Sequence, residues 1–355
     1  MSITSYISGL GSYTPENEVK NADFLNHQFL HEDGSPFDQE NKIIVEKFKS
    51  ITGIEARRYA SDDEMASDLA FKASLKAIER SNLELEDLDY IIVAHNFGDL
   101  KKGSTNGDIL PSLASRVKQK LAIKNPNCIA YDLLYGCPGW LQGVIHADAF
   151  IKAGLANNAL VIGTETLSRV VDASDRDSMI FADGAGACVM EKQVPNAKEG
   201  ILATAAQTYA NEEADYLFSG VGNVPDDKTE GYIKMKGRKI YEFALTKVPA
   251  AMKIALDKSG ASIDDVKKIF IHQANEKMDE AIVKRFFRLY KKQMPDDVMP
   301  MNIHELGNSS VATIPTLMDM VINDRYGNHK VEKGDLIILA SVGAGMNINA
   351  VIYRY

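Results

Sequence analysis

The sequence has little that would support a membrane-spanning, metal-binding or disulfide-stabilised protein. No run of about 18 apolar residues could span a membrane, and the N-terminus lacks the basic start and long apolar segment of a secretory signal. Its three cysteines show no CxxC spacing, and its histidines show no HExxH spacing. We therefore expect a cytoplasmic protein without a disulfide framework, a metal ion or a membrane span.

The chain has fewer basic than acidic residues, and its formal net charge is −9 at pH 7. This balance argues against nucleic acid as the main partner. The hydrophobic share of 45% and the charged share of 25% are ordinary for a globular protein. A chain of 355 residues is too long for one small core, so we expect two domains or one fused repeat.

An internal repeat with an offset of about 178 residues organises the chain. Residues 85–93 match residues 263–271, and each segment is an acidic turn that leads into a short apolar run. Residues 159–164 match residues 336–341, and each is an apolar run that ends in small residues. Apolar runs that alternate with helical stretches are typical of parallel strands covered by helices. The repeat therefore predicts two βαβαβ-type halves.

The repeat favours an α/β fold of five layers, α-β-α-β-α, built from two duplicated halves. Pro138 and Pro315 occupy equivalent places, each in the first turn of a helix that we expect in the central layer. We place the two halves at residues 1–195 and 196–355. The first half holds the candidate nucleophile, and the second holds its candidate partners.

Cys137 stands between an apolar strand and a helix. The strand runs into Gly136, and Pro138 opens the helix. Unpaired backbone N–H groups and the positive end of the helix dipole favour a thiolate at this place, and a lowered thiol pKa suits a covalent nucleophile. Cys128 and Cys188 are flanked by strand-like residues, and we interpret them as buried structural cysteines.

Two polar residues of the second half are candidate partners. His272 ends the apolar run 268–271, and catalytic groups gather at the carboxyl ends of parallel strands. Asn308 lies in a Gly-Asn-Ser turn. Taken alone, each would more often be structural. We interpret His95, at the equivalent strand end of the first half, as structural, with the lining of an acyl tunnel as the alternative.

Taken together, these motifs resemble the type III β-ketoacyl-acyl-carrier-protein synthases of the thiolase superfamily. The similarity is strongest in Gly136-Cys137-Pro138-Gly139, His272-Gln273-Ala274-Asn275, Gly307-Asn308-Ser309-Ser310, Asp183-Gly184-Ala185-Gly186-Ala187 and Gly343-Ala344-Gly345. The resemblance implies a thiolase-like fold, a homodimer and a Cys-His-Asn triad, which maps onto Cys137, His272 and Asn308.

The same resemblance implies a decarboxylative condensation. Cys137 would take an acyl group from a thioester, and its backbone N–H and that of Ala344 would form the oxyanion hole. His272 and Asn308 would donate hydrogen bonds to the thioester oxygen of malonyl carrier protein. Gly343 would contribute to substrate binding. The implied reaction needs no cofactor beyond acyl-coenzyme A or acyl-carrier-protein and malonyl-carrier-protein as substrates.

Some residues depart from the family pattern. The family's coenzyme A-binding tryptophan and arginine are missing from Lys47-Phe48-Lys49-Ser50-Ile51, whereas a later arginine of that site is retained as Arg176. This favours an acyl-carrier-protein starter over acetyl-coenzyme A. We expect Trp140 and an insertion at about residues 97–120 to alter the acyl pocket, and a second insertion falls at about residues 28–50. A specialised pathway is as well supported as primary fatty acid synthesis.

The helix after His272 carries basic residues that would suit an acidic carrier protein. The resemblance assigns docking to Lys277, Lys284 and Arg285. Two other functions stay open. One is transfer of the acyl group to an oxygen or nitrogen nucleophile, which malonyl-dependent release of CO₂ would distinguish. The other is a non-catalytic partner subunit, against which the intact triad argues.

Overall fold

The computed structural model describes residues 4–194, 197–225, 229–323 and 326–355. Its first sheet has the strand order β1-β7-β6-β4-β5. Strand β4 pairs in parallel with β5 and β6, and β7 runs antiparallel to both β6 and β1. The bounds are β1 Ser5–Tyr13, β4 Tyr90–Ala94, β5 Ile129–Leu133, β6 Asn158–Thr166 and β7 Asp183–Lys192.

The second sheet has the order β11-β12-β13-β8. Only β11 and β12 pair in parallel, while β13 runs antiparallel to both β12 and β8. The sheets are therefore mixed rather than wholly parallel, because each half returns through an antiparallel strand. The bounds are β8 Gly200–Thr208, β11 Val266–Ile271, β12 Leu336–Gly343 and β13 Asn347–Arg354.

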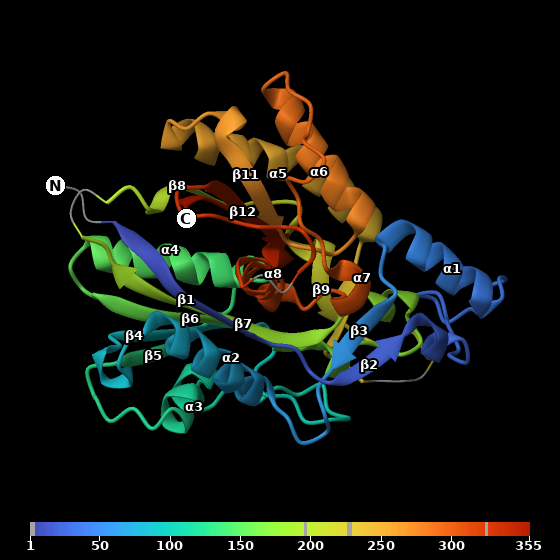
Figure 1. Ribbon diagram of the computed structural model, residues 1–355. Coiled ribbons are helices and arrows are strands. Elements are labelled where there is room, and N and C mark those ends of the chain that lie inside the picture. The colour runs from blue at the N-terminus through green and yellow to red at the C-terminus, as the bar shows by residue number, and fades with distance from the viewer. Residues whose placement is uncertain (1–3, 195–196, 226–228, 324–325) are drawn as a thin grey trace.

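Helices cover both sheets and fill the space between them, which gives the five predicted layers (Figure 1). In the order of Figure 1, α5 and α6 lie above the second sheet, α4 and α8 between the sheets, and α2 and α3 below the first sheet. The bounds are α2 Ala66–Ser81, α3 Leu113–Lys120, α4 Gly139–Lys152, α5 Gly237–Ser259, α6 Glu276–Leu289 and α8 Thr313–Ile322. The predicted fold class is confirmed.

Small residues let the central helices lie directly on the strands. A Cβ at Gly143 of α4 would come 2.7 Å from Val161 Cγ1 in β6, and one at Gly186 of β7 would come 2.7 Å from the side chain of Pro315 in α8. All residues of α8 except Met320 and Ile322 are buried, which explains why its apolar sequence shows no solvent face. The central layer is thus a shared core that fixes the two halves together.

The matched segments of the repeat form equivalent elements. Residues 85–87 and 263–265 are 3₁₀ helices, and each leads into a parallel strand, β4 or β11. Residues 159–164 and 336–341 lie in β6 and β12. The predicted boundary between the halves, after residue 195, lies outside the described residues and stays a prediction.

The remaining elements lie outside the two large sheets. They are β2 Asn17–Lys20, β3 Ala56–Tyr59, β9 Leu217–Gly220, β10 Tyr232–Met235, α1 Asn41–Thr52 and α7 Ile303–Leu306, with 3₁₀ helices at Asn21–Phe24, Leu167–Arg169, Arg176–Ile180, Ala214–Tyr216, Ser310–Ala312 and Ala344–Met346. Within the described residues, no helix is long and apolar enough to cross a membrane.

Candidate active site

Cys137 lies at the start of α4, as the sequence predicts. The chain leaves β5 and turns at Gly136, whose φ of +69° is the left-handed conformation that favours glycine. The Gly139 N–H donates to the Gly136 carbonyl at 2.9 Å, and Pro138 is the N-cap of α4. The turn therefore places the thiol beside the positive end of the helix.

Two glycines bring the Cys137 turn against the loop that follows β12. A Cβ at Gly343 would lie 2.4 Å from the backbone nitrogen of Cys137, and one at Gly136 would lie 2.7 Å from the backbone nitrogen of Ala344. No real side chain tolerates such distances, so both positions require glycine. The close approach brings the backbone of Gly136 and Cys137 against that of Gly343 and Ala344, the two segments that contain the predicted oxyanion-hole residues.

His272 and Asn308 reach the same place from the second half. The His272 N–H extends the pairing of β11 by donating to Ala340 O at 2.8 Å. Asn308 is tied to a first-half segment, because its N–H donates to Ile180 O at 2.9 Å and its carbonyl accepts from Ala182 N–H at 2.9 Å. These bonds hold the backbone of both residues in place, and the Asn308 side chain is held further because its Oδ1 accepts from the Ser310 N–H at 2.8 Å.

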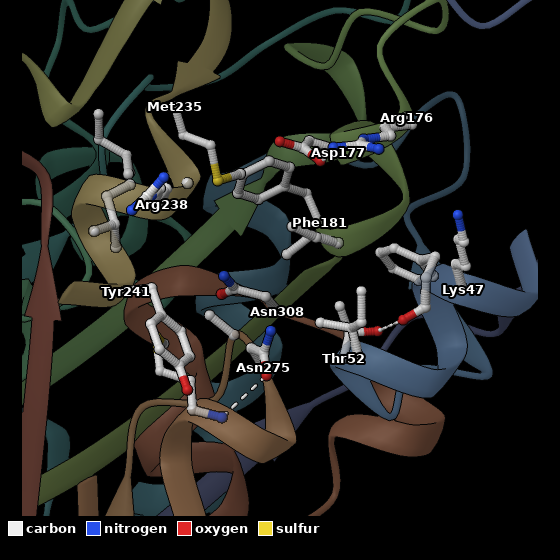
Figure 2. A pocket seen from close by; sticks show the side chains of 18 of the residues that line it. Lys47, Thr52, Arg176, Asp177, Phe181, Met235, Arg238, Tyr241, Asn275 and Asn308 are labelled. Atoms are coloured by element: carbon white, nitrogen blue, oxygen red, sulfur yellow. Dashed lines mark hydrogen bonds and ion pairs between the residues drawn. The ribbon is translucent and has the colours of Figure 1, made fainter. Parts of the chain in front are cut away.

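A cavity of about 610 Å³ contains all three predicted triad residues in its wall. Its outer part is bounded by α1, α5 and the segment before α1. Figure 2 shows Lys47 and Arg176 on one side, Arg238 and Tyr241 on the other, and Asn308 between them. The cavity is thus a passage, lined by cations on its outer part, that ends at the candidate nucleophile.

A second, smaller cavity of about 230 Å³ also reaches Cys137. Most of its lining is apolar: Phe97, Leu167, Phe181, Leu217, Phe218 and Ile233. Phe181 and Leu217 line both cavities, so Cys137 stands where the two meet. A thioester arm in the larger cavity could therefore deliver its acyl chain into the smaller one.

Burial controls the ionisation of the site. It raises the pKa of the Cys137 thiol to about 11, although a hydrogen bond from Ser310 acts in the opposite direction. The prediction of a lowered thiol pKa from the helix start is therefore wrong, because desolvation outweighs the favourable contacts. Burial also lowers the pKa of His272 to about 4, so its imidazole is neutral at pH 7.

The other predicted site residues have mixed outcomes. Arg176 and Gly343 line the larger cavity. Trp140 lines neither cavity, and the prediction that it shapes the acyl pocket is wrong. Its ring points into the core between the sheets, is 1% exposed, and donates from Nε1 to Val161 O at 3.2 Å. As the second residue of α4, it turns away from the thiol.

The predicted docking residues lie on the outer layer. Lys277, Lys284 and Arg285 are exposed on α6, with Lys284 paired to Glu280 at 2.6 Å. His95 is structural, as predicted: it is 1% exposed and bonded to Asp132 at 2.9 Å. Cys128 and Cys188 are buried. Among the residues described, no group of three or more potential ligands could hold a metal ion.

Sequence reasoning missed the residues that surround the triad. Phe37 and His31 both line the larger cavity. They belong to the insertion near residues 28–50, for which the sequence predicts no function. Asn96 and Ser310 line the smaller cavity. The Gly-Asn-Ser-Ser motif pointed to the region of Ser310, but no sequence signal pointed to Asn96.

Comparisons with known proteins agree with this geometry. Residues 131–210 match the family described as 3-oxoacyl-[acyl-carrier-protein] synthase III, and residues 256–355 match its C-terminal part. A beta-ketoacyl-[acyl-carrier-protein] synthase III of Sphingopyxis alaskensis is 31% identical over the whole of both chains, and one of Paracoccus denitrificans is 32% identical over 98% of each.

Solved structures give the same result. The crystal structure of a 3-oxoacyl-[acyl-carrier-protein] synthase III from Aquifex aeolicus has a TM-score of 0.80 and 31% identity, with 99% of this chain and 100% of that chain covered. The chain therefore belongs to the 3-oxoacyl-[acyl-carrier-protein] synthase III family.

Proposed function

We propose that this protein joins a Cys137-bound acyl starter to malonyl carrier protein with loss of CO₂. The observation that supports this most strongly is the meeting of two cavities at Cys137, with His272 and Asn308 in the wall of the larger one. A condensing enzyme needs one space for the thioester arm and another for the acyl chain. A purely non-catalytic partner subunit needs neither.

The reaction takes place in two steps. The Cys137 sulfur attacks the starter thioester, forms a new carbon–sulfur bond and releases the donor thiol, which takes up the proton. Malonyl thioester then loses CO₂, and the resulting enolate carbon attacks the acyl-cysteine carbonyl, which releases the Cys137 thiolate. Neutral His272 and the Asn308 amide donate to the enolate oxygen, while the backbone N–H groups of Cys137 and Ala344 stabilise the tetrahedral oxyanion.

The acyl donor in this proposal is a carrier protein rather than coenzyme A. The segment 47–51 lacks the family's coenzyme A-binding tryptophan and arginine, and its residues Lys47 and Ile51 line the larger cavity. Arg176 is retained, but its guanidinium lies over the ring of Phe37, 5.3 Å from the centroid. Because Phe37 already stacks on the Arg176 guanidinium, this face of the guanidinium is not free to stack on the adenine of coenzyme A.

No further cofactor enters this reaction, because thioester exchange and decarboxylation supply all the bonds that change. A basic α6 face next to the larger cavity fits an acidic carrier protein. The homodimer expected from the family fits the exposed strand β5, which ends the first sheet and carries Ile129 at 50% exposure.

The proposal is tested with purified protein, a panel of acyl donors and malonyl carrier protein. We expect malonyl-dependent CO₂ release and a 3-oxoacyl product in the wild type, neither in Cys137→Ala, and strongly reduced condensation in His272→Ala and Asn308→Ala. Acyl-carrier-protein donors should be used more efficiently than the matching coenzyme A thioesters. An acyl product on an oxygen or nitrogen nucleophile, without CO₂, would contradict the condensation.

A further inference from the structure

Ser310 contacts all three residues of the proposed triad. Its hydroxyl donates to Cys137 Sγ at 3.3 Å, and its backbone N–H donates to Asn308 Oδ1 at 2.8 Å. The Ser310 backbone also lies close enough to His272 to act on its pKa, which it raises against the larger effect of burial. Ser310 is 4% exposed and has a φ of +52°, a conformation that non-glycine residues rarely adopt. Such strain at a buried turn is typical of functional sites.

The direction of the bond to sulfur is set by Asn96. The Asn96 side-chain nitrogen donates to Ser310 Oγ at 3.2 Å and also to Glu165 Oε1. Because an amide NH₂ group can only donate, the Ser310 oxygen must accept this bond. Its own hydrogen is then available for Cys137, so the three bonds form a directed path from a carboxyl group to the thiol.

Glu165 anchors the path without placing an anion beside the sulfur. It lies in β6 and is 1% exposed. Burial raises the pKa of Glu165 to about 8, and the nearby carboxylate of Asp183 acts in the same direction. Glu165 is therefore mostly neutral at pH 7. An ionised Glu165 would instead raise the pKa of the Cys137 thiol.

We propose that Ser310 is a positioning residue that stabilises the Cys137 thiolate through its hydroxyl, and that Asn96, anchored by Glu165, sets the direction of that hydrogen bond. This inference rests on the proposed role of Cys137 as the nucleophile. It explains how a thiol in a desolvated place can ionise: a buried, pre-oriented donor replaces part of the hydration that burial removes. No proton leaves Ser310 in this role.

The test measures the rate at which iodoacetamide alkylates Cys137 as a function of pH, followed by peptide mass spectrometry. Alkylation needs only the thiolate, so it is independent of condensation. We expect Ser310→Ala to shift the profile upward by about one pH unit and to slow alkylation about tenfold at neutral pH, because a hydrogen bond to a charged group has about this strength. Asn96→Leu should give a smaller shift in the same direction.

Thr313→Val is the matched control. Thr313 is the first residue of α8, three positions after Ser310, and its buried hydroxyl has no hydrogen-bond partner among the described residues. Its profile should match the wild type. Wild-type profiles in both test variants would overturn the inference, and a shift in Ser310→Ala alone would overturn the part assigned to Asn96. Normal alkylation without acylation by any thioester would instead count against the proposed function.

Discussion

At the scale of single residues, burial decides which groups around Cys137 are charged. The thiol and the Glu165 carboxyl both keep their protons at neutral pH, and His272 stays without one. These three groups are therefore all uncharged at neutral pH. Binding of a thioester brings a carbonyl that the neutral groups can stabilise as negative charge develops, which is where electrostatic preorganisation has its largest effect.

The raised pKa of Glu165 predicts a pH-dependent stability. Its folded pKa of about 8 lies above the ordinary value of 4.5. The stabilisation linked to its proton is thus complete below about pH 4.5 and is lost as the pH rises towards 8. Glu165→Gln does not titrate, so by pH 8 it should be more stable than the wild type by on the order of 4 kcal/mol.

Urea unfolding at pH 5 and pH 8 measures this difference. The gap between Glu165→Gln and the wild type should grow from pH 5 to pH 8. A constant gap would show that Glu165 does not keep its proton in the folded protein. Asp183→Asn is a useful comparison, because burial also raises the pKa of Asp183, to about 6, so its gap should reach its full size at a lower pH.

Gly136 offers a second test at residue scale. Gly136→Ala places a Cβ 2.7 Å from the Ala344 nitrogen and should lower kcat by about 100-fold or more, the usual effect of disturbing an oxyanion hole. Gly154→Ala is the matched control, because Gly154 also has a positive φ, +74°, but a Cβ there meets nothing within 4 Å.

Both substitutions should cost about 1 kcal/mol of stability through backbone strain, and Gly136→Ala should cost more because its Cβ also meets the Ala344 backbone; thermal unfolding measures both costs. Only Gly136→Ala should lose activity in the condensation assay. Equal activities of the two variants would contradict the assignment of the Ala344 backbone to the oxyanion hole.

At the scale of elements, α6 makes the proposed docking testable. Lys277→Glu and Lys284→Glu should raise KM for carrier-protein substrates about tenfold, leave kcat nearly unchanged and weaken the dependence on salt, because they reverse charges in an exposed basic patch. Lys124→Glu, an exposed residue that follows α3 in the opposite outer layer, is the control. An equal rise in KM in all three variants would show a general effect of net charge.

Elements that follow hydrophobic pattern could be predicted from sequence, and elements set by close packing could not. Short apolar runs in the sequence predicted the buried strands β4, β6, β11 and β12, and the turn at Gly136 predicted the start of α4. The prediction for Trp140 was wrong because the position of a residue around the helix axis, not its type, decides whether its side chain faces a cavity or the core. The thiol pKa was misjudged because a helix start is visible in sequence, whereas the depth of burial is not.

At the scale of the whole molecule, the active site depends on both halves. The first half supplies Cys137, and the second supplies His272, Asn308 and Ala344. Repeat matching could predict that these strand ends meet. It could not predict the contact of Asn96 with Ser310, or that of Phe37 with Arg176, because these contacts depend on how loops meet in space.

The exposed edge of the first sheet predicts association of two copies. Ile129, the first residue of the edge strand β5, is 50% exposed, and Leu134, which directly follows this strand, is 60% exposed. Ile129→Lys should convert a dimer to a monomer, because unpaired edge strands join readily and a lysine opposes this. Light scattering measures the mass. Leu75→Lys, 45% exposed on α2, should leave the mass unchanged, and a monomeric wild type would contradict the prediction.

The central claim is that Cys137 carries the acyl group, and intact-protein mass spectrometry tests it most directly. Wild-type protein and Cys137→Ala are incubated with a panel of acyl-carrier-protein and acyl-coenzyme A thioesters. We predict an added acyl mass in the wild type only, which disappears with release of CO₂ when malonyl carrier protein is added. An equal acyl mass on Cys137→Ala, or no acyl mass from any donor, would contradict the claim.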